Sequence, residues 1–106
     1  MSLATDWSTR YSYTENNVER YAPTSGGVYR LIYQSGDKFY PFYIGRSNDL
    51  RRRLLEHISP SEVDSCIKRH LRNNTCFFRF VTISSKTDRI TEEQAQIREY
   101  NPNCNG

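Results

Sequence analysis

Two apolar runs joined by a short polar turn decide the fold of this chain: GVYRLIY at residues 27–33 and FYPFYIG at residues 39–45, with Ser-Gly-Asp at 35–37 between them. Both runs are rich in β-branched and aromatic residues, which favour strands, and the intervening residues favour a tight turn. The pattern predicts a β-hairpin. Pro41 has no backbone N–H to donate, so the second strand is expected to lie at a sheet edge or to contain a bulge there.

The register of this hairpin decides whether Tyr29 and Tyr43 share a face of the sheet. A two-residue turn would offset the two tyrosines by one position and place them on opposite faces, because side chains alternate along a strand. A three-residue turn would pair them directly. We expect the three-residue turn, or a bulge near Pro41 that restores the same pairing.

Capping residues and apolar runs mark the elements that follow the hairpin. They predict a helix capped by Ser47 or Asn48 and ending near residue 58, a helix over 62–72 opened by Ser61 and Asp64, a strand over 76–83, and a last helix opened by Thr87 or Thr91 that ends before Pro102. The resulting order is ββααβα. It predicts an α+β protein with a small three-stranded, mainly antiparallel sheet flanked by helices.

A chain of 106 residues suits one domain with a single modest core. We assign residues 1–25 to a polar, irregular N-terminal arm and residues 26–106 to the folded domain. Tyrosines alternate with arginines in the arm, which suits either stacking on nucleic-acid bases or covering of the apolar edge of the core; we favour the second. No apolar run approaches the roughly 18 residues of a membrane span, and no signal peptide is visible, so a cytoplasmic location is expected.

Positive charge is concentrated in the middle of the chain. The 15 lysines and arginines exceed the 12 acidic residues by only three, too little to indicate nucleic-acid binding alone. The concentrated residues are Arg46, Arg51, Arg52, Arg53, Lys68, Arg69 and Arg72. They suit a surface that follows a phosphate backbone, and they suit equally well the solvated faces of two helices.

Helical spacing separates Arg53 from the two arginines before it. Leu50 and Leu54 define an apolar stripe on the first long helix, and Arg53 lies at the edge of that stripe, with His57 one turn later. A guanidinium at the margin of a cleft offers a planar donor fork that fits two phosphate oxygens. A surface ion pair with a neighbouring carboxylate is the alternative for Arg53, and a packing role is the alternative for His57.

The last helix carries the most informative carboxylate. Its predicted apolar face is formed by Ile90, Ile97 and Tyr100. Glu93 falls inside that face, whereas Glu92 points away from it. A carboxylate on an apolar face needs a partner, either a buried arginine or a divalent cation. Because Mg²⁺ often takes only one or two protein carboxylates, Glu93 alone is a sufficient ligand.

The cysteines and histidines do not form a recognisable zinc motif. Cys66, Cys76 and Cys104 are an odd set without CxxC spacing. Cys66 and His70 are four residues apart on one helix and both fall on its apolar stripe, which predicts buried core residues rather than metal ligands.

The tripeptides at 27–29 and 43–45, followed by Arg53, Glu93 and Asn105, together resemble the signature of the GIY-YIG nuclease family. The resemblance covers residues 27–105 and implies the α+β fold expected above. It also implies an endonuclease that binds Mg²⁺ or Mn²⁺ through Glu93 and leaves 5′-phosphate and 3′-hydroxyl ends on DNA.

The same resemblance implies a division of labour among the site residues. Tyr29 and Tyr43 activate and orient the attacking water, Arg53 binds the scissile phosphate, and Asn105 ties the C-terminal segment to the site. Further candidates are His57 for catalysis, Gly27 for support of the site, and Gly45, Arg46, Arg51 and Arg69 for contact with nucleic acid.

Two other functions remain open from the sequence. The first is a non-catalytic nucleic-acid-binding module, with DNA as the preferred ligand and RNA as the alternative. The second is an interaction subunit that forms a homodimer or joins a larger nuclease.

Overall fold

The structure, a computed structural model, describes residue 4 and residues 6–105; residues 1–3 and 5 of the N-terminal arm and Gly106 lie outside the described residues. The elements are, in chain order, β1 (Tyr11–Ser12), α1 (Glu15–Tyr21), β2 (Gly27–Ser35), β3 (Lys38–Ser47), α2 (Leu50–His57), α3 (Ser65–Asn73), β4 (Cys76–Thr82), α4 (Lys86–Tyr100) and the 3₁₀ turn η1 (Asn103–Asn105).

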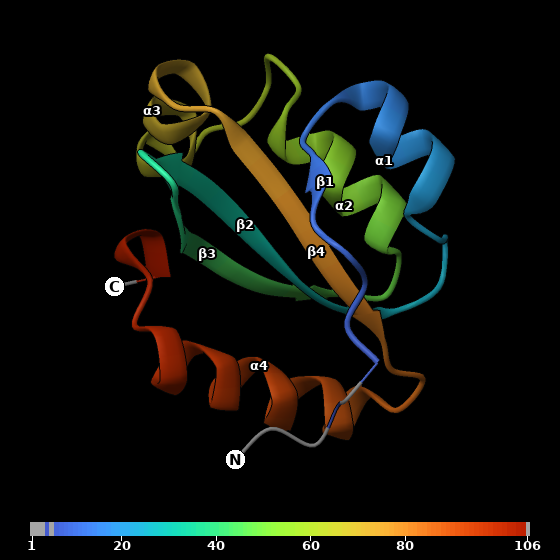
Figure 1. The fold of residues 1–106 in the computed structure, drawn as a ribbon. Coiled ribbons are helices and arrows are strands. Elements are labelled where there is room, and N and C mark those ends of the chain that lie inside the picture. The colour runs from blue at the N-terminus through green and yellow to red at the C-terminus, as the bar shows by residue number, and fades with distance from the viewer. Residues whose placement is uncertain (1–3, 5, 106) are drawn as a thin grey trace.

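The strands form one antiparallel sheet in the order β1-β4-β2-β3 (Figure 1). The α+β class is confirmed, but the sheet has four strands and not three. The additional strand, β1, comes from the arm that we expected to be irregular, and Tyr11 pairs there with Phe78. Two residues are too few for a periodic signal, so only the pairing with β4 makes this segment a strand.

Each face of the sheet has its own apolar cluster. Helices α1, α2 and α3 cover one face, on which Tyr29 and Leu31 pack against residues such as Leu54. Helix α4 covers the other face, on which Val28 and Ile44 lie (Figure 1). The tyrosine hydroxyl of Tyr13 donates to the carbonyl of Leu54 over 2.7 Å, so the arm packs on α2, as the sequence favoured. Among the described helices, none is both long and apolar enough to cross a membrane.

The hairpin between β2 and β3 differs from the predicted register. Its turn has two residues, with Ser35 paired to Lys38, and the register shifts between Leu31 and Ile32. The shift lies opposite Pro41, where a bulge was expected. As a result Tyr29 pairs with Gly45, and Tyr43 pairs with Leu31. The expected direct pairing of the two tyrosines is therefore wrong.

The bulge nevertheless places both tyrosines on the same face. Tyr43 pairs with Leu31, two residues from Tyr29, and side chains two residues apart point to the same side. The rings of Tyr29 and Tyr43 lie 6.2 Å apart. One extra residue in β3 thus places the two tyrosines on the same face of the sheet, which we had expected mainly from a longer turn.

The helix caps also differ from those predicted. Asp49 caps α2 and accepts from the backbone N–H of Arg52, Asp64 caps α3, and Ser85 caps α4. Ser47, one of the expected caps, is bonded through its hydroxyl to the backbone of Asp49 and forms the turn before the helix. Several polar residues precede each helix, and sequence alone does not show which one reaches the free N–H groups.

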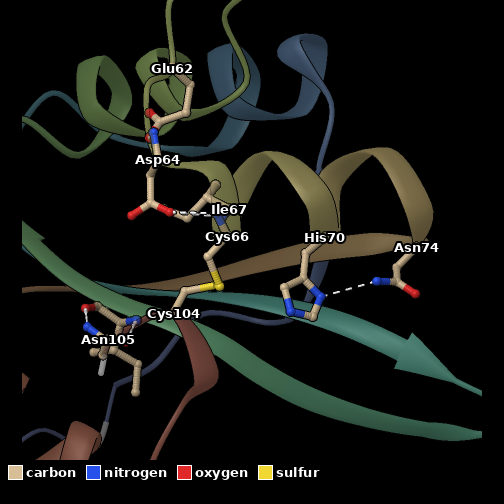
Figure 2. The surroundings of a disulfide bond; sticks show 9 residues. Glu62, Asp64, Cys66, Ile67, His70, Asn74, Cys104 and Asn105 are labelled. Atoms are coloured by element: carbon tan, nitrogen blue, oxygen red, sulfur yellow. Dashed lines mark hydrogen bonds between the residues drawn. A yellow bond between two sulfur atoms is a disulfide. The ribbon is translucent and has the colours of Figure 1, made fainter.

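A disulfide joins Cys66 in α3 to Cys104 in η1, with 5.6 Å between the Cα atoms (Figure 2). Cys66 and His70, which we expected to be buried core residues, are half-buried. Their helical spacing showed that they are neighbours, but Cys104 lies 38 residues away and is brought to them by the fold.

Candidate active site

Tyr29 is the centre of the candidate site. It lies in β2, between β3 and β4, and is 1% exposed beneath α2. Its hydroxyl lies 2.7 Å from Nε2 of His57 at the end of α2. Leu50 and Leu54 pack helix α2 against the strand. These two residues form the apolar stripe at whose edge the sequence placed His57. His57 is 1% exposed, so the stripe is wider than predicted.

His57 has a second polar partner that sequence reasoning missed. Its Nδ1 lies 3.2 Å from Oε2 of Glu62, a carboxylate only 9% exposed. The other carboxylate oxygen of Glu62 accepts from the backbone N–H of Asp64. We expected Glu62 to begin a helix, but it lies in the turn before α3, and a five-residue spacing across a turn gives no periodic signal.

The surrounding groups decide where the protons lie in this chain of residues. Burial lowers the pKa of His57, and Arg53 lowers it further, against the opposing effect of Glu62. A neutral imidazole donates from Nδ1 to Glu62 and accepts at Nε2, so Tyr29 donates its hydroxyl proton to His57. Burial raises the pKa of Tyr29, and the nearby Tyr43 adds to this effect, while Arg53 opposes it.

Tyr43 and Arg53 complete this side of the site. The ring of Tyr43 lies edge-on to His57 at 5.4 Å, and the residue is half-buried. Burial raises its pKa and Arg53 lowers it, which places the guanidinium beside both tyrosines. Arg53 also forms an ion pair with Glu56 over 3.1 Å, the alternative that its surface position suggested. Arg53 therefore forms the ion pair while it also lies near both tyrosines.

The two motif glycines are needed for steric reasons. A Cβ on Gly45 would lie 2.3 Å from the hydroxyl oxygen of Tyr29, and a Cβ on Gly27 would lie 2.0 Å from the carbonyl oxygen of Val81. Gly45 is buried, so the phenol of Tyr29 occupies the space that we expected a substrate to approach. The absence of a side chain at 45 is what allows Tyr29 to reach His57.

The charged residues of α4 are arranged differently from the prediction. Glu92, expected to point away from the protein, is fully buried, and Tyr100, expected on the apolar face, is 37% exposed. The buried side of α4 is polar: Gln96 donates to Glu92 over 2.9 Å and accepts from Arg30 over 2.8 Å. A helix can bury carboxylate and amide groups when they bond to one another, so apolar residues alone misidentified this face.

Glu93 lies beside this buried face, with a side chain 15% exposed, and forms an ion pair with Arg46 of β3. It is close enough to raise the pKa of both Tyr29 and Tyr43. A half-buried carboxylate whose charge is felt by both tyrosines, and whose ion-pair partner is exposed, fits a single-carboxylate magnesium site. The donor set therefore fits the cation that the family resemblance implies.

Asn105 is bonded to the backbone of β3 between the two motif residues Tyr43 and Gly45. Its side-chain oxygen accepts from the N–H of Ile44 over 2.8 Å, and its nitrogen donates to the carbonyl of Ile44 over 2.8 Å. Both bonds are made by one amide, which fixes the 3₁₀ turn against the strand.

The remaining basic candidates lie apart from these contacts. Arg51 donates from Nε to the carbonyl of Ala22 over 2.8 Å, which links α2 to the end of α1. Arg69 is exposed on α3. Of the expected site residues, the structure brings together Tyr29, Tyr43, Arg53, His57 and Glu93, with Arg46 paired to Glu93, and it places Arg51 and Arg69 outside this group.

The chain is similar in sequence to two known proteins. The chain is 30% identical over 89 residues to UvrABC system protein C of Aquifex aeolicus, covering 84% of this chain and 15% of that protein. It is 26% identical over 98 residues to the corresponding protein of Bdellovibrio bacteriovorus, covering 92% of this chain and 15% of that protein. The chain thus spans a small part of these relatives.

The fold has a close counterpart among solved structures. The N-terminal GIY-YIG endonuclease domain of UvrC from Thermotoga maritima, solved with its catalytic magnesium ion, matches with a TM-score of 0.65 at 21% identity, covering 88% of this chain and all of that one. The family model of the UvrC-like GIY-YIG domain matches residues 25–106, and the chain therefore belongs to that family.

Proposed function

We propose that this domain is an endonuclease that hydrolyses DNA phosphodiester bonds with one divalent cation on Glu93, leaving 5′-phosphate and 3′-hydroxyl ends. The observation that carries the proposal is the hydrogen-bonded series Tyr29–His57–Glu62, whose tyrosine lies beside Arg53 and is influenced by the charge of Glu93. Family membership supports the same activity.

The series gives Tyr29 a way to act as a base although its pKa is raised. Water donates a proton to the hydroxyl oxygen of Tyr29 while the tyrosine proton passes to Nε2 of His57. The imidazolium that forms is stabilised by Glu62 at Nδ1. No free phenolate has to accumulate, because the two transfers are linked through one hydroxyl.

Arg53 supplies the permanent positive charge in this mechanism. Burial acts to lower its pKa, but the tyrosines and Glu56 outweigh that effect and raise it, so the guanidinium stays protonated. Part of the side chain, 37%, is exposed and accessible to a phosphate. It stabilises the charge that develops on the phosphate oxygens, and the hydroxyl of Tyr43 helps to orient the water.

Glu93 would hold the divalent cation, which would supply Lewis-acid polarisation of a phosphate oxygen when bound. Arg46 pairs with Glu93 in the structure and has to release the carboxylate when the cation binds. The side chain of Arg46 is 44% exposed, so it is free to turn toward a phosphate of the substrate. We propose Mg²⁺ as the cation, with Mn²⁺ as a substitute.

We extend the proposal to the wider context of the domain. Arg51 and Arg69 add positive charge to the DNA-binding surface, and Gly27 and Asn105 support the site. The catalytic unit is residues 26–106, with residues 1–25 as an arm, and its location is the cytoplasm. Because the relatives are much longer, a larger nuclease assembly is a proposed context, with a homodimer as the alternative.

Cleavage assays on supercoiled, branched and single-stranded DNA with Mg²⁺ or Mn²⁺ test the proposal. We expect Glu93→Gln and Arg53→Ala each to slow cleavage by about 100-fold or more. Matched controls remove neighbouring charges of the same type: Arg52→Ala on α2 and Glu99→Gln on α4, both exposed, should retain activity. Equal cutting by all five proteins would show that the nuclease is a contaminant.

A second candidate function is DNA binding without cleavage. It is favoured by the ion pairs Arg46–Glu93 and Arg53–Glu56, which satisfy the two charged site residues within the chain. A binding module would shift DNA in a gel equally well with Glu93→Gln and would not cut it under any metal condition.

A further inference from the structure

The sulfur atoms of Cys66 and Cys104 and a ring nitrogen of His70 lie within 4.8 Å of one another (Figure 2). Two of these residues come from α3 and the third comes from η1. Helical spacing identified only the Cys66–His70 pair, which by itself is a weak cation site. The fold adds a third ligand, Cys104, from the C-terminal turn.

We propose that Cys66, Cys104 and His70 form a binding site for a soft divalent cation such as Zn²⁺ when the disulfide is reduced. Two thiolates and one imidazole are ligands that zinc prefers, and three protein ligands leave a fourth position for water. The site differs from the one proposed at Glu93 in the metal that it selects, because sulfur ligands disfavour magnesium, which prefers oxygen.

The position of His70 is fixed by contacts that leave one nitrogen for a cation. Its ring stacks on Phe42 with 4.5 Å between centroids, and its Nδ1 lies 3.1 Å from the amide of Asn74. A half-turn of that amide presents oxygen to Nδ1, which then donates its proton and leaves the Nε2 lone pair free. Such an outer hydrogen bond is the usual support of a histidine ligand.

The two forms of the site are related by a balanced redox step. A small dithiol or a phosphine supplies two electrons, and with two protons the S–S bond is converted into two thiols, while the reductant is oxidised. Binding of Zn²⁺ then displaces both thiol protons and forms two metal–sulfur bonds. Disulfides are rare in reducing cytoplasm, so the thiol form is the one expected at the proposed location.

The site would serve as a staple in either form. Cys104 directly precedes Asn105, whose amide holds Ile44 of β3 between the motif residues. A disulfide or a bound cation therefore connects α3 to the turn that carries this amide. With neither present, the turn is held by hydrogen bonds and packing alone.

Cobalt is a suitable probe because thiolate ligands give Co²⁺ a characteristic charge-transfer absorption. We expect the full chain, reduced with a phosphine and freed of excess reductant, to bind one equivalent of Co²⁺ with that absorption and to release it to Zn²⁺. The oxidised chain should show no such absorption, because its sulfurs are bonded to each other. This comparison needs no substitution and so does not depend on the folding of a variant.

Substitutions then identify the ligands. Cys66→Ser and Cys104→Ser should abolish the absorption, and Asn74→Ala should weaken binding by about ten-fold or more. The matched control is Cys76→Ser: Cys76 is the free cysteine and its thiol donates to the backbone carbonyl of His70, close to the site but outside the ligand group. Glu93→Gln should also retain the absorption.

Two results would overturn the proposal. One is the absence of thiolate absorption in a reduced chain whose circular dichroism shows an intact fold. The other is absorption that survives both Cys66→Ser and Cys104→Ser, or that is lost with Cys76→Ser alone. Cleavage activity is not part of this test, so it is independent of the function proposed for Glu93.

Discussion

The candidate site has two halves that are built in different ways. The tyrosine half, consisting of Tyr29, Tyr43, Arg53 and His57, is centred on two residues that are each 1% exposed and joined by a hydrogen bond. The glutamate half, consisting of Glu93 and Arg46, is an ion pair whose side chains are 15% and 44% exposed. The first half is assembled by the protein alone, whereas the second is held by a pairing that a cation can replace.

The difference follows from position in the fold. Tyr29 lies on a central strand that is paired on both sides and covered by α2, so its hydroxyl must find a partner inside the protein. Arg46 lies on the edge strand β3, and its ion pair with Glu93 of α4 is partly exposed to solvent. Water weakens such an ion pair, so the replacement of Arg46 by a cation as the partner of Glu93 costs little free energy.

The largest effect is expected from the removal of the imidazole in the tyrosine half. His57→Gln takes away the proton acceptor of Tyr29, and we expect cleavage to slow by about 100-fold or more. Leu55→Ala, on the same helix at a half-buried position, is the control for a general loss of packing. Equal losses in both variants would contradict a chemical role for His57.

The same residue predicts a pH dependence. Because the pKa of His57 is lowered in the fold, the unfolded chain binds more protons below its ordinary value of about 6.5. We expect stability to be unaffected by His57 above that pH and to fall as the pH drops toward the lowered value. Cleavage should fall only as the pH reaches the lowered pKa, where His57 becomes protonated in the folded chain. Urea unfolding of His57→Gln should lack this component of the pH dependence.

The next effect concerns the space for Tyr29. Gly45→Ala forces a Cβ against the tyrosine hydroxyl, and we expect a loss of about 1–3 kcal/mol in the free energy of unfolding. Urea denaturation measures it. The control is Gly36→Asn in the hairpin turn, where nothing lies within 4 Å of a Cβ and asparagine tolerates the positive φ of 63°. A smaller loss at Gly45 than at Gly36 would show that Tyr29 moves without cost.

The contact between the C-terminal turn and β3 is expected to matter to a similar or smaller degree. Asn105→Ala leaves the N–H and C=O of Ile44 without their partner, which costs about 1–3 kcal/mol when no water replaces it. Hydrogen exchange at the Ile44 amide should become faster. Asn103→Ala, exposed in the same turn, should change neither quantity; unchanged protection in Asn105→Ala would exclude the amide as an anchor.

The smallest effect is expected from the removal of Arg46 in the glutamate half. Arg46→Gln removes the competitor of the cation, and since a surface ion pair contributes about 1 kcal/mol at most, Mg²⁺ should bind up to about five-fold more tightly. Calorimetric titration without DNA measures this change. Arg98→Gln removes one charge from the exposed side of α4. The same gain in both variants would indicate net charge rather than the ion pair.

Much of the fold could be read from local patterns. The runs at 27–33 and 39–45 are long enough to predict the hairpin, and Pro41 marked its bulge, because missing N–H groups and alternating apolar residues act locally. Strand β1 and helix α1 could not be predicted from the sequence, since both are short and depend on contacts with β4 and α2. These partners are distant in the sequence, so the local pattern of residues does not indicate them.

For the site, the sequence by itself determined the identities and offsets that define the family, and it selected Arg53 from three adjacent arginines. Only the tertiary structure decided that Glu62 forms a hydrogen bond with His57 and that Arg46 forms an ion pair with Glu93. It also decided that Cys104 meets Cys66. Periodicity reports which residues share a face of one element, whereas a hydrogen bond, an ion pair or a disulfide between elements depends on how those elements pack.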